Sequence, residues 1–465
     1  MMMALQHTKM AIIALQFLTL VAGQKTCSIG DNVKCPDNSR AYCHGKMCCP
    51  GNRGERNYPC PSAPPGWGHG ACQESTKRVD CLKPGPPTPP PTPSPPWPAD
   101  KPFECSSPYE VKNLAAMEKK GFCLDDTTFE VCPNKLLAQW PNIKSGLNVT
   151  SLRLFKSWHP KWGDDGARHR AWEALTKYVF DNNVKVLIGT QVTCNGPEDD
   201  RMWAWDLELM KMLGPDHIMG LAVGNEMDIF HRQCGGKSLW DLWNWRYWQL
   251  LQSRVDDMDK LGFTNVKVTI VWAMSVLGGY PWKEDGQAKV NTLVKQAFQK
   301  WGDRFVWSFN VYSIWDASMW PHNKGDCDAR TKASVSIEYT KGILKAARQR
   351  IKATTGGDSN PIWVGENGWS SPMPVGHPKF PFCPDYDSQD TFRLAYENFL
   401  AWDLSLNDGL VGPEHAFYFT MRDSFNVGAS ESFGLVATCS DTSCKVQSGP
   451  STSGSLGTNS SEVIV

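Results

Sequence analysis

Two short segments each place a glutamate at the end of an apolar run. GLAVGNEMD carries Asn225 and Glu226, and PIWVGENGWSS carries Glu366 three residues before Trp369. A carboxylate taken out of water is costly unless it is paired or its pKa is shifted. Two facing carboxylates supply what cleavage of a glycosidic bond requires, because one protonates the leaving oxygen while the other attacks the sugar or activates water. Glu226 and Glu366 are therefore candidate catalytic residues.

Each glutamate also has an ordinary structural interpretation. A glutamate at a strand end often caps a helix or pairs with a cation, and an Asn-Glu dipeptide alone is a weak motif. Competing chemistries find little support: the sequence has no GxSxG, no P-loop and no GxGxxG after a strand, and its ten histidines form no HExxH or comparable spacing. We expect neither a metal nor a cofactor.

Eight apolar runs predict the elements that position these glutamates. Most are near-continuous, as in buried parallel strands, and helical patterns lie between them. Eight such repeats predict a (β/α)8 TIM barrel of the α/β class over residues 101–446, with its active site at the carboxyl ends of the strands; a doubly wound open sheet is the alternative. The runs are 121–125, 151–157, 184–190, 218–225, 266–272, 305–312, 361–366 and 415–421.

Aromatic side chains near these strand ends are candidates for contact with a sugar. Tyr312, Trp272 and Trp369 each lie near the end of a predicted strand. Flat apolar rings can stack on sugar rings, but tryptophans in a chain with 21 of them more often pack in the core. Both interpretations stay open for these residues.

The sequence outside the barrel predicts a secreted, modular protein. Residues 1–23 resemble a signal peptide, because the apolar run of Met10 to Ala22 is too short to span a bilayer. Residues 24–83 hold eight of the 17 cysteines, which indicates a disulfide-rich module. Ten prolines in residues 84–98 predict an extended linker over 84–100, and the Ser/Gly-rich residues 447–465 predict a disordered tail.

Cysteine and charge counts constrain these regions further. The vicinal Cys48 and Cys49 could suggest a metal site, but the module has no second thiol pair at a CxxC spacing, so disulfides are favoured. The module is either carbohydrate-binding or a structural or protein-contact knot. Nine cysteines follow, so one is free or bonded to another chain unless a pair crosses between regions. Lys and Arg total 48, equal to Asp and Glu, which argues against a nucleic-acid partner. We expect a monomer with no membrane span, and the sequons at Asn148 and Asn459 allow glycosylation.

The chain resembles glycoside hydrolase family 17, the β-1,3-glucanases of plants and fungi and their relatives. The resemblance spans most of residues 120–438 and implies a retaining, endo-acting enzyme on β-1,3-glucan, with Glu226 as acid/base and Glu366 as nucleophile. It is carried, in order, by LRLFKSW, AVGNEMD, VTIVWAMSVLGGYPW, FNVYSIWD, VGENGWSS and AFYFTMRDSFNVGASESFGLV.

Several positions depart from the family pattern. Asn367 and Ser370 replace a small or β-branched residue and a proline, Arg422 to Ser424 replace an acidic pair, and Glu431 is displaced by one position. These departures leave the glutamate pair intact and bear on subsites and linkage preference.

This resemblance leads to a specific expectation for each site residue. Arg153 and Tyr312 should keep Glu366 ionised through a nearby cation and a hydrogen bond. Burial and the charge of Glu366 should raise the pKa of Glu226, so that it is protonated and acts as the acid. Asn225 should hydrogen-bond the sugar 2-hydroxyl, and Trp369 should form the sugar platform. A glucan transglycosylase and a non-catalytic glucan-binding protein are the alternative functions.

Overall fold

The structure is a computed structural model. It describes residues 110–446 except 145, 285–288, 427–428 and 442–443, together with Phe103, Cys105 and five short strands between residues 32 and 79. Side chains are described only within the barrel region, and within that region those of residues 425–430 are left out. The predicted signal peptide, linker and tail lie outside the described residues.

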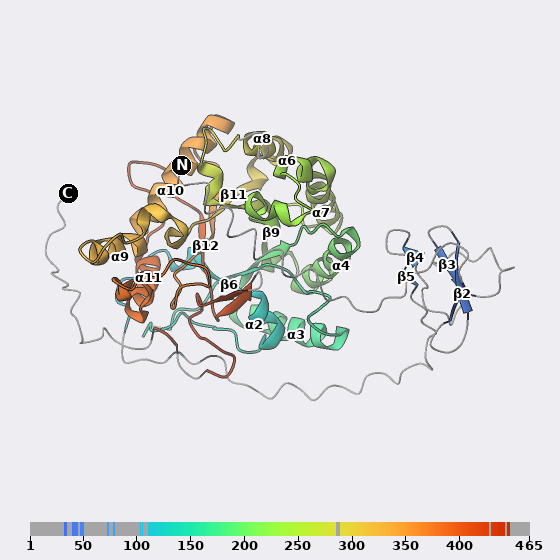
Figure 1. Ribbon diagram of the computed structural model, residues 1–465, viewed down its shortest axis with the longest axis horizontal. Coiled ribbons are helices and arrows are strands. Elements are labelled where there is room, and N and C mark those ends of the chain that lie inside the picture. Colours follow the sequence, from blue (N-terminus) through green and yellow to red (C-terminus); the bar gives the residue numbers. More distant parts are fainter. Residues whose placement is uncertain are drawn as a thin grey trace. The chain divides into compact units, whose positions relative to one another are not determined.

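Eight parallel strands close into a barrel in which spatial order follows sequence order (Figure 1). The last strand pairs with the first through Phe417 and Gly121, so the sheet has no free edge. This closure confirms the predicted (β/α)8 barrel and rules out the open sheet. The strands are β6 (Lys120–Leu124), β7 (Ser151–Leu154), β8 (Lys185–Thr190), β9 (Ile218–Asn225), β10 (Lys267–Ala273), β11 (Phe305–Asn310), β12 (Ile362–Asn367) and β13 (His415–Tyr418).

Each predicted apolar run overlaps one of these strands, with boundaries that differ by a few residues at most. The runs 151–157, 305–312 and 415–421 continue past the observed ends of β7, β11 and β13, because the chain stays largely buried where it enters the loops that follow these strands. Apolar sequence alone does not distinguish a strand from a buried loop that follows it.

Helices surround the barrel (Figure 1). Several begin with a side-chain cap: Asp164 accepts a hydrogen bond from the backbone N–H of Ala167, and Ser388 accepts one from Thr391. The helical pattern over 239–261 becomes α6 (Leu239–Leu242), a π-helical segment η5 (Trp243–Tyr247) and α7 (Trp248–Lys260). The other long helices are α3 (Asp165–Asn182), α4 (Gly196–Leu213), α8 (Val290–Trp301), α10 (Ile337–Thr355) and α11 (Gln389–Ala401); shorter ones are α2 (Asp126–Val131), α5 (Met227–Phe230) and α9 (Cys327–Val335).

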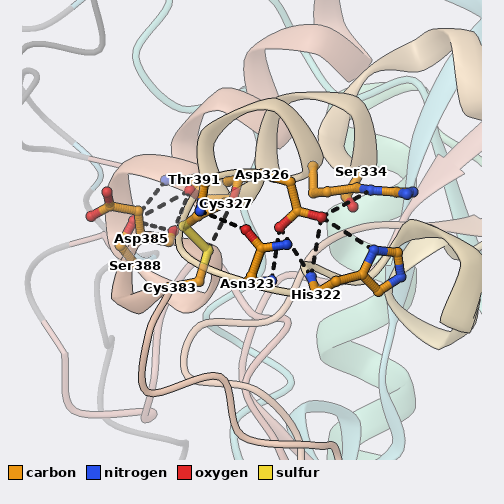
Figure 2. Close-up of a disulfide and its surroundings, with 12 residues drawn as sticks. His322, Asn323, Asp326, Cys327, Ser334, Cys383, Asp385, Ser388 and Thr391 are labelled. Carbon is orange, nitrogen blue, oxygen red and sulfur yellow. Dashed lines mark hydrogen bonds and ion pairs between the residues drawn. A yellow bond between two sulfur atoms is a disulfide. The ribbon is translucent and has the colours of Figure 1, made fainter.

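Four disulfides tie the described loops and termini together. Two of them fasten the start of the barrel region to its end, one joins the loops after β8 and β9, and one joins α9 to the loop before α11. Figure 2 shows the last of these beside Asp326, which accepts hydrogen bonds from two backbone N–H groups. Cys123 is the free, buried cysteine among the described residues. The pairs are Cys105–Cys444, Cys132–Cys439, Cys194–Cys234 and Cys327–Cys383.

A separate compact unit, residues 1–95, contains the five short strands. β1 (Asn32–Lys34), β2 (Arg40–His44) and β3 (Met47–Pro50) form an antiparallel sheet, and β4 (Cys72–Gln73) pairs with β5 (Arg78–Val79). Within the described part of the chain, no helix is long and apolar enough to cross a bilayer.

Candidate active site

The two candidate glutamates meet at the mouth of the barrel, where Asn310 bridges them. Asn310 Nδ2 donates to Glu226 Oε1 at 2.9 Å and to Glu366 Oε1 at 2.8 Å. The three residues come from the ends of β9, β11 and β12. The structure therefore brings together the two carboxylates that the sequence singled out, at the end of the barrel where the fold places active sites.

Local irregularities in two strands aim these side chains inward. In β9, Ala222 pairs with Thr269 and Asn225 pairs with Val271, so β9 contains one extra residue. In β12 the register shifts similarly before Glu366, which pairs with Asn310. Such bulges re-aim side chains and are common next to active sites.

Glu226 adopts a backbone conformation that is uncommon for a residue with a side chain. Its φ is 50° and its ψ is 38°, in the left-handed region. Together with the bulge, this turn lets two consecutive residues, Asn225 and Glu226, both face the centre of the mouth: each accepts a hydrogen bond from Asn310 Nδ2. A regular strand would direct them to opposite faces.

Glu366 is held by three donors. Its Oε1 accepts from Arg153 Nη1 at 3.0 Å and from Asn310, and its Oε2 accepts from the hydroxyl of Tyr312 at 2.7 Å. The side chains of Arg153 and Glu366 are only 2% and 8% exposed. Burial, and then the charge of Glu366, raise the pKa of Tyr312, so the phenol keeps the proton that it donates. The contacts with Arg153 and Tyr312 are the cation and the hydrogen bond that the sequence analysis expected at Glu366.

Glu226 has the opposite electrostatic environment. Burial raises its pKa most, and the negative charge of Glu366 raises it further, whereas the hydrogen bond from Asn310 lowers it. A carboxyl group with a raised pKa beside a second carboxyl group is the arrangement in which one residue can act as the acid. The direction agrees with the expectation from the sequence.

Arg153 also orders the neighbouring amide. Its Nη2 donates to Asn225 Oδ1 at 2.7 Å, while Asn310 Nδ2 donates to the same oxygen at 3.2 Å. The amide nitrogen of Asn225 is then the end of that side chain that can donate to a sugar hydroxyl.

The two predicted tryptophan contacts are not open to a ligand. Val271 lines the barrel interior, because a Cβ atom added at Gly365 would approach Val271, Asn310 and Arg153 together. Trp272 is the next residue along β10, so it faces the surrounding helices, and it is fully buried. Trp369 is 1% exposed and packs edge-on against Tyr386. Neither ring offers a face for stacking, so the structure does not support either as a sugar platform.

Sequence reasoning missed the bridging residue Asn310 and did not single out the exposed Trp315. Asn310 is a polar residue inside the apolar run FVWSFNVY, and that mismatch was the available signal. Trp315 lies in η8 (Ser313–Trp315), directly after β11, and its side chain is 44% exposed. Among the described residues, no group of three or more His, Cys, Asp and Glu side chains could hold a metal ion.

Comparisons with known proteins return structural similarity only. No protein-family model matches the chain, and no curated protein matches it. An active-site mutant of Rhizomucor miehei β-1,3-glucanosyltransferase in complex with laminaritriose shares 11% identity and a TM-score of 0.40, over 71% of this chain and 96% of that one.

Two further solved structures show a comparable similarity. One of two plant β-glucan endohydrolases shares 14% identity and a TM-score of 0.43, over 68% of this chain and 95% of that one. A family 17 β-1,3-glucanosyltransferase from Rhizomucor miehei shares 12% identity and a TM-score of 0.36, over 64% of this chain and 84% of that one. At these levels of identity and superposition, the similarity carries no inference about activity.

Proposed function

We propose that this protein is a retaining glycoside hydrolase that cleaves β-1,3-glucan internally, with Glu226 as acid/base and Glu366 as nucleophile. The observation that carries the proposal is the bridge through Asn310. Because one nitrogen lies 2.9 Å from Glu226 Oε1 and 2.8 Å from Glu366 Oε1, these oxygens are separated by no more than the sum of the two distances. A single bridging nitrogen keeps the two groups close together, which favours the retaining arrangement, whose carboxyl groups lie about 5–5.5 Å apart, over the inverting one, which needs room for a water molecule between them.

The geometry supports a double displacement. In the first step, the Glu366 carboxylate attacks the anomeric carbon while Glu226 transfers its proton to the departing glycosidic oxygen, leaving a glycosyl ester on Glu366. In the second step, Glu226, now ionised, takes a proton from water, whose oxygen displaces Glu366 from the same carbon. The three donors on Glu366 hold its carboxyl group in place for the attack.

Neighbouring groups would bind the sugar. Asn225, with its Oδ1 held by Arg153 and Asn310, can direct its amide nitrogen to the sugar 2-hydroxyl, a contact that strengthens in the transition state. The ring of Trp315, in the segment that follows β11, is exposed whereas that of Trp369 is buried, so Trp315 is the better candidate stacking surface. The choice of β-1,3-glucan as substrate follows from the ordered motifs in the sequence.

The assay uses the purified full-length protein with laminarin and with carboxymethyl-cellulose, and it follows reducing ends and product lengths together. We expect laminarin to be cleaved to short oligomers, and Glu226→Gln and Glu366→Gln to abolish turnover while retaining binding. Glu173→Gln, an exposed glutamate on α3, is the matched control and should stay active.

Each other outcome has a definite meaning. An active Glu366→Gln enzyme would refute the assignment of the nucleophile. Products longer than the starting chains would identify a transglycosylase on the same site. Cleaved cellulose with inert laminarin would assign a different linkage, and no cleavage of either, with retained binding, would support a glucan-binding protein.

We also propose that the protein is secreted and that residues 24–83 form a carbohydrate-binding module. Four disulfides in the barrel region are consistent with an oxidising compartment. A stiff linker between a small module and an enzyme raises the effective concentration of the enzyme on a polymeric substrate.

A further inference from the structure

Glu226 requires support for the conformation that the proposed chemistry uses. A residue with a side chain in the left-handed region is strained, and it persists only where its surroundings enforce that conformation. Part of the enforcement is in the backbone, since Glu226 N donates to Val271 O at 2.8 Å and Glu226 O accepts from Ile229 N and Phe230 N. These bonds fix the two ends of Glu226, and the bond to Val271 joins it to β10 through the backbone alone.

Asp228 adds a side-chain attachment between this turn and the end of β10. It lies in α5, two residues after Glu226, and its carboxylate reaches across to the end of the neighbouring strand. Oδ1 accepts from the backbone N–H of Ala273 at 3.1 Å, and Oδ2 accepts from the hydroxyl of Ser275 at 2.7 Å. Asp228 is 9% exposed, so these bonds are made largely out of contact with water.

We propose that Asp228 is a positioning residue for the acid/base, holding the turn that carries Glu226 against the end of β10 and placing a second negative charge beside it. The inference rests on the proposed function, because it assumes that Glu226 delivers a proton. Asp228 itself does not face the substrate, since both of its oxygens are engaged by β10 and the segment that follows.

The charge of Asp228 has a direction of effect on Glu226. Burial, Glu366 and Asp228 all raise the pKa of Glu226, whereas Asn310 and Arg153 lower it. Two further groups interact with Asp228: the positive charge of Lys283 lowers the pKa of Asp228, and the charge of Asp228 raises the pKa of Tyr247. Removing the charge of Asp228 while keeping its shape should therefore make Glu226 lose its proton at lower pH.

The test compares two substrates that differ in their need for an acid. Laminarin has a poor leaving group that must be protonated, whereas the leaving group of 2,4-dinitrophenyl β-laminaribioside departs without a proton. For Asp228→Asn we expect kcat/KM on laminarin to fall by about 10²-fold, because small displacements of a catalytic group have effects of that size. The loss on the dinitrophenyl substrate should be much smaller, and the alkaline limb of the laminarin pH profile should move to lower pH.

A second variant separates anchoring from charge. Ser275→Ala keeps the carboxylate but removes one of its two bonds, so it should lose laminarin activity by a smaller factor with the alkaline limb unmoved. Asp181→Asn, an exposed aspartate on α3, is the matched control and should resemble wild type.

The outcomes also separate this inference from the proposed function. If wild type does not cleave laminarin, or Glu226→Gln is as active as wild type, the proposed function fails whatever Asp228 does. If wild type is active and Asp228→Asn keeps its laminarin rate and its alkaline limb, the inference is overturned. Equal losses on both substrates would show a merely structural role, as would Asp228→Asn failing to fold together with a fully active Ser275→Ala.

Discussion

The guanidinium of Arg153 lies 3.0 Å from the carboxylate of Glu366, and both side chains are almost completely shielded from water. A second guanidinium nitrogen of Arg153 donates to Asn225 at 2.7 Å. One residue of β7 therefore orients both the proposed nucleophile and the amide proposed to bind the sugar. Removing one partner of a buried ion pair leaves the other charge buried and uncompensated. The stability lost in this way exceeds the net stability that the intact pair contributes.

Replacing Arg153 with methionine should damage stability and activity together. We expect the free energy of unfolding to fall by about 3–5 kcal/mol. Glu366 would be left buried without its cation and without one of the donors that orient it, so attack on the sugar should slow sharply. Chemical denaturation and kcat/KM on laminarin measure the two effects. Arg153→Lys keeps the positive charge but has no second nitrogen with which to contact Glu366 and Asn225 together. Compared with the methionine variant, it should restore more of the stability than of the activity.

The rate of laminarin cleavage should fall on the alkaline side as Glu226 loses its proton. Because the pKa of Glu226 is raised, the protonated acid persists above the range of an ordinary glutamate, and activity declines as the pH rises through the raised value. The same shift makes a contribution to stability that is present below the unfolded-state pKa and lost as the pH rises through the folded-state value. A pH profile of kcat/KM tests this, and a rate that keeps increasing with pH would contradict it.

Lys120 should be important for stability but not for catalysis. It is fully buried at the start of β6, and its ammonium donates to the backbone carbonyls of Ala115, Leu400 and Trp402 at 2.6 to 2.8 Å. Lys120→Met should destabilise the fold by about 2 kcal/mol or more, since each buried acceptor without a donor costs about 1–3 kcal/mol. Thermal denaturation measures this.

The neighbouring exposed lysine offers the control for that variant. Lys119→Met should leave the melting temperature close to that of wild type. Any Lys120→Met protein that remains folded should cleave laminarin at the normal rate, because Lys120 lies at the end of β6 opposite the mouth. A Lys120→Met protein as stable as Lys119→Met would show that the three carbonyls find other donors.

Deleting residues 24–100 should affect insoluble substrate more than soluble substrate. If the module binds carbohydrate, its removal lowers the effective concentration of the enzyme on a solid glucan but not on a dissolved one. The measurement is the ratio of activities on insoluble and soluble β-glucan for the full-length and shortened chains. Equal losses on both substrates, or no loss on either, would argue against a targeting role.

The repeated apolar runs were sufficient to predict the barrel and the position of its two glutamates. A strand buried on both faces has to be apolar along its length, so each run marks its own strand, and a glutamate ending such a run lies at the rim. Glu226 and Glu366 were identifiable for this reason. An odd number of cysteines in the barrel region likewise indicated an unpaired one, which is Cys123.

Side-chain direction, by contrast, was decided only by tertiary structure. The rim position of Trp272 was predicted correctly, but strand alternation relative to Val271 turns its ring toward the helices. The bulges in β9 and β12 change which face of the strand the side chains of Glu226 and Glu366 point to. No pattern in the sequence predicted these bulges. Asn310 and Asp228 act through contacts with residues on other elements, so their roles became visible only when the barrel closed and brought those elements together.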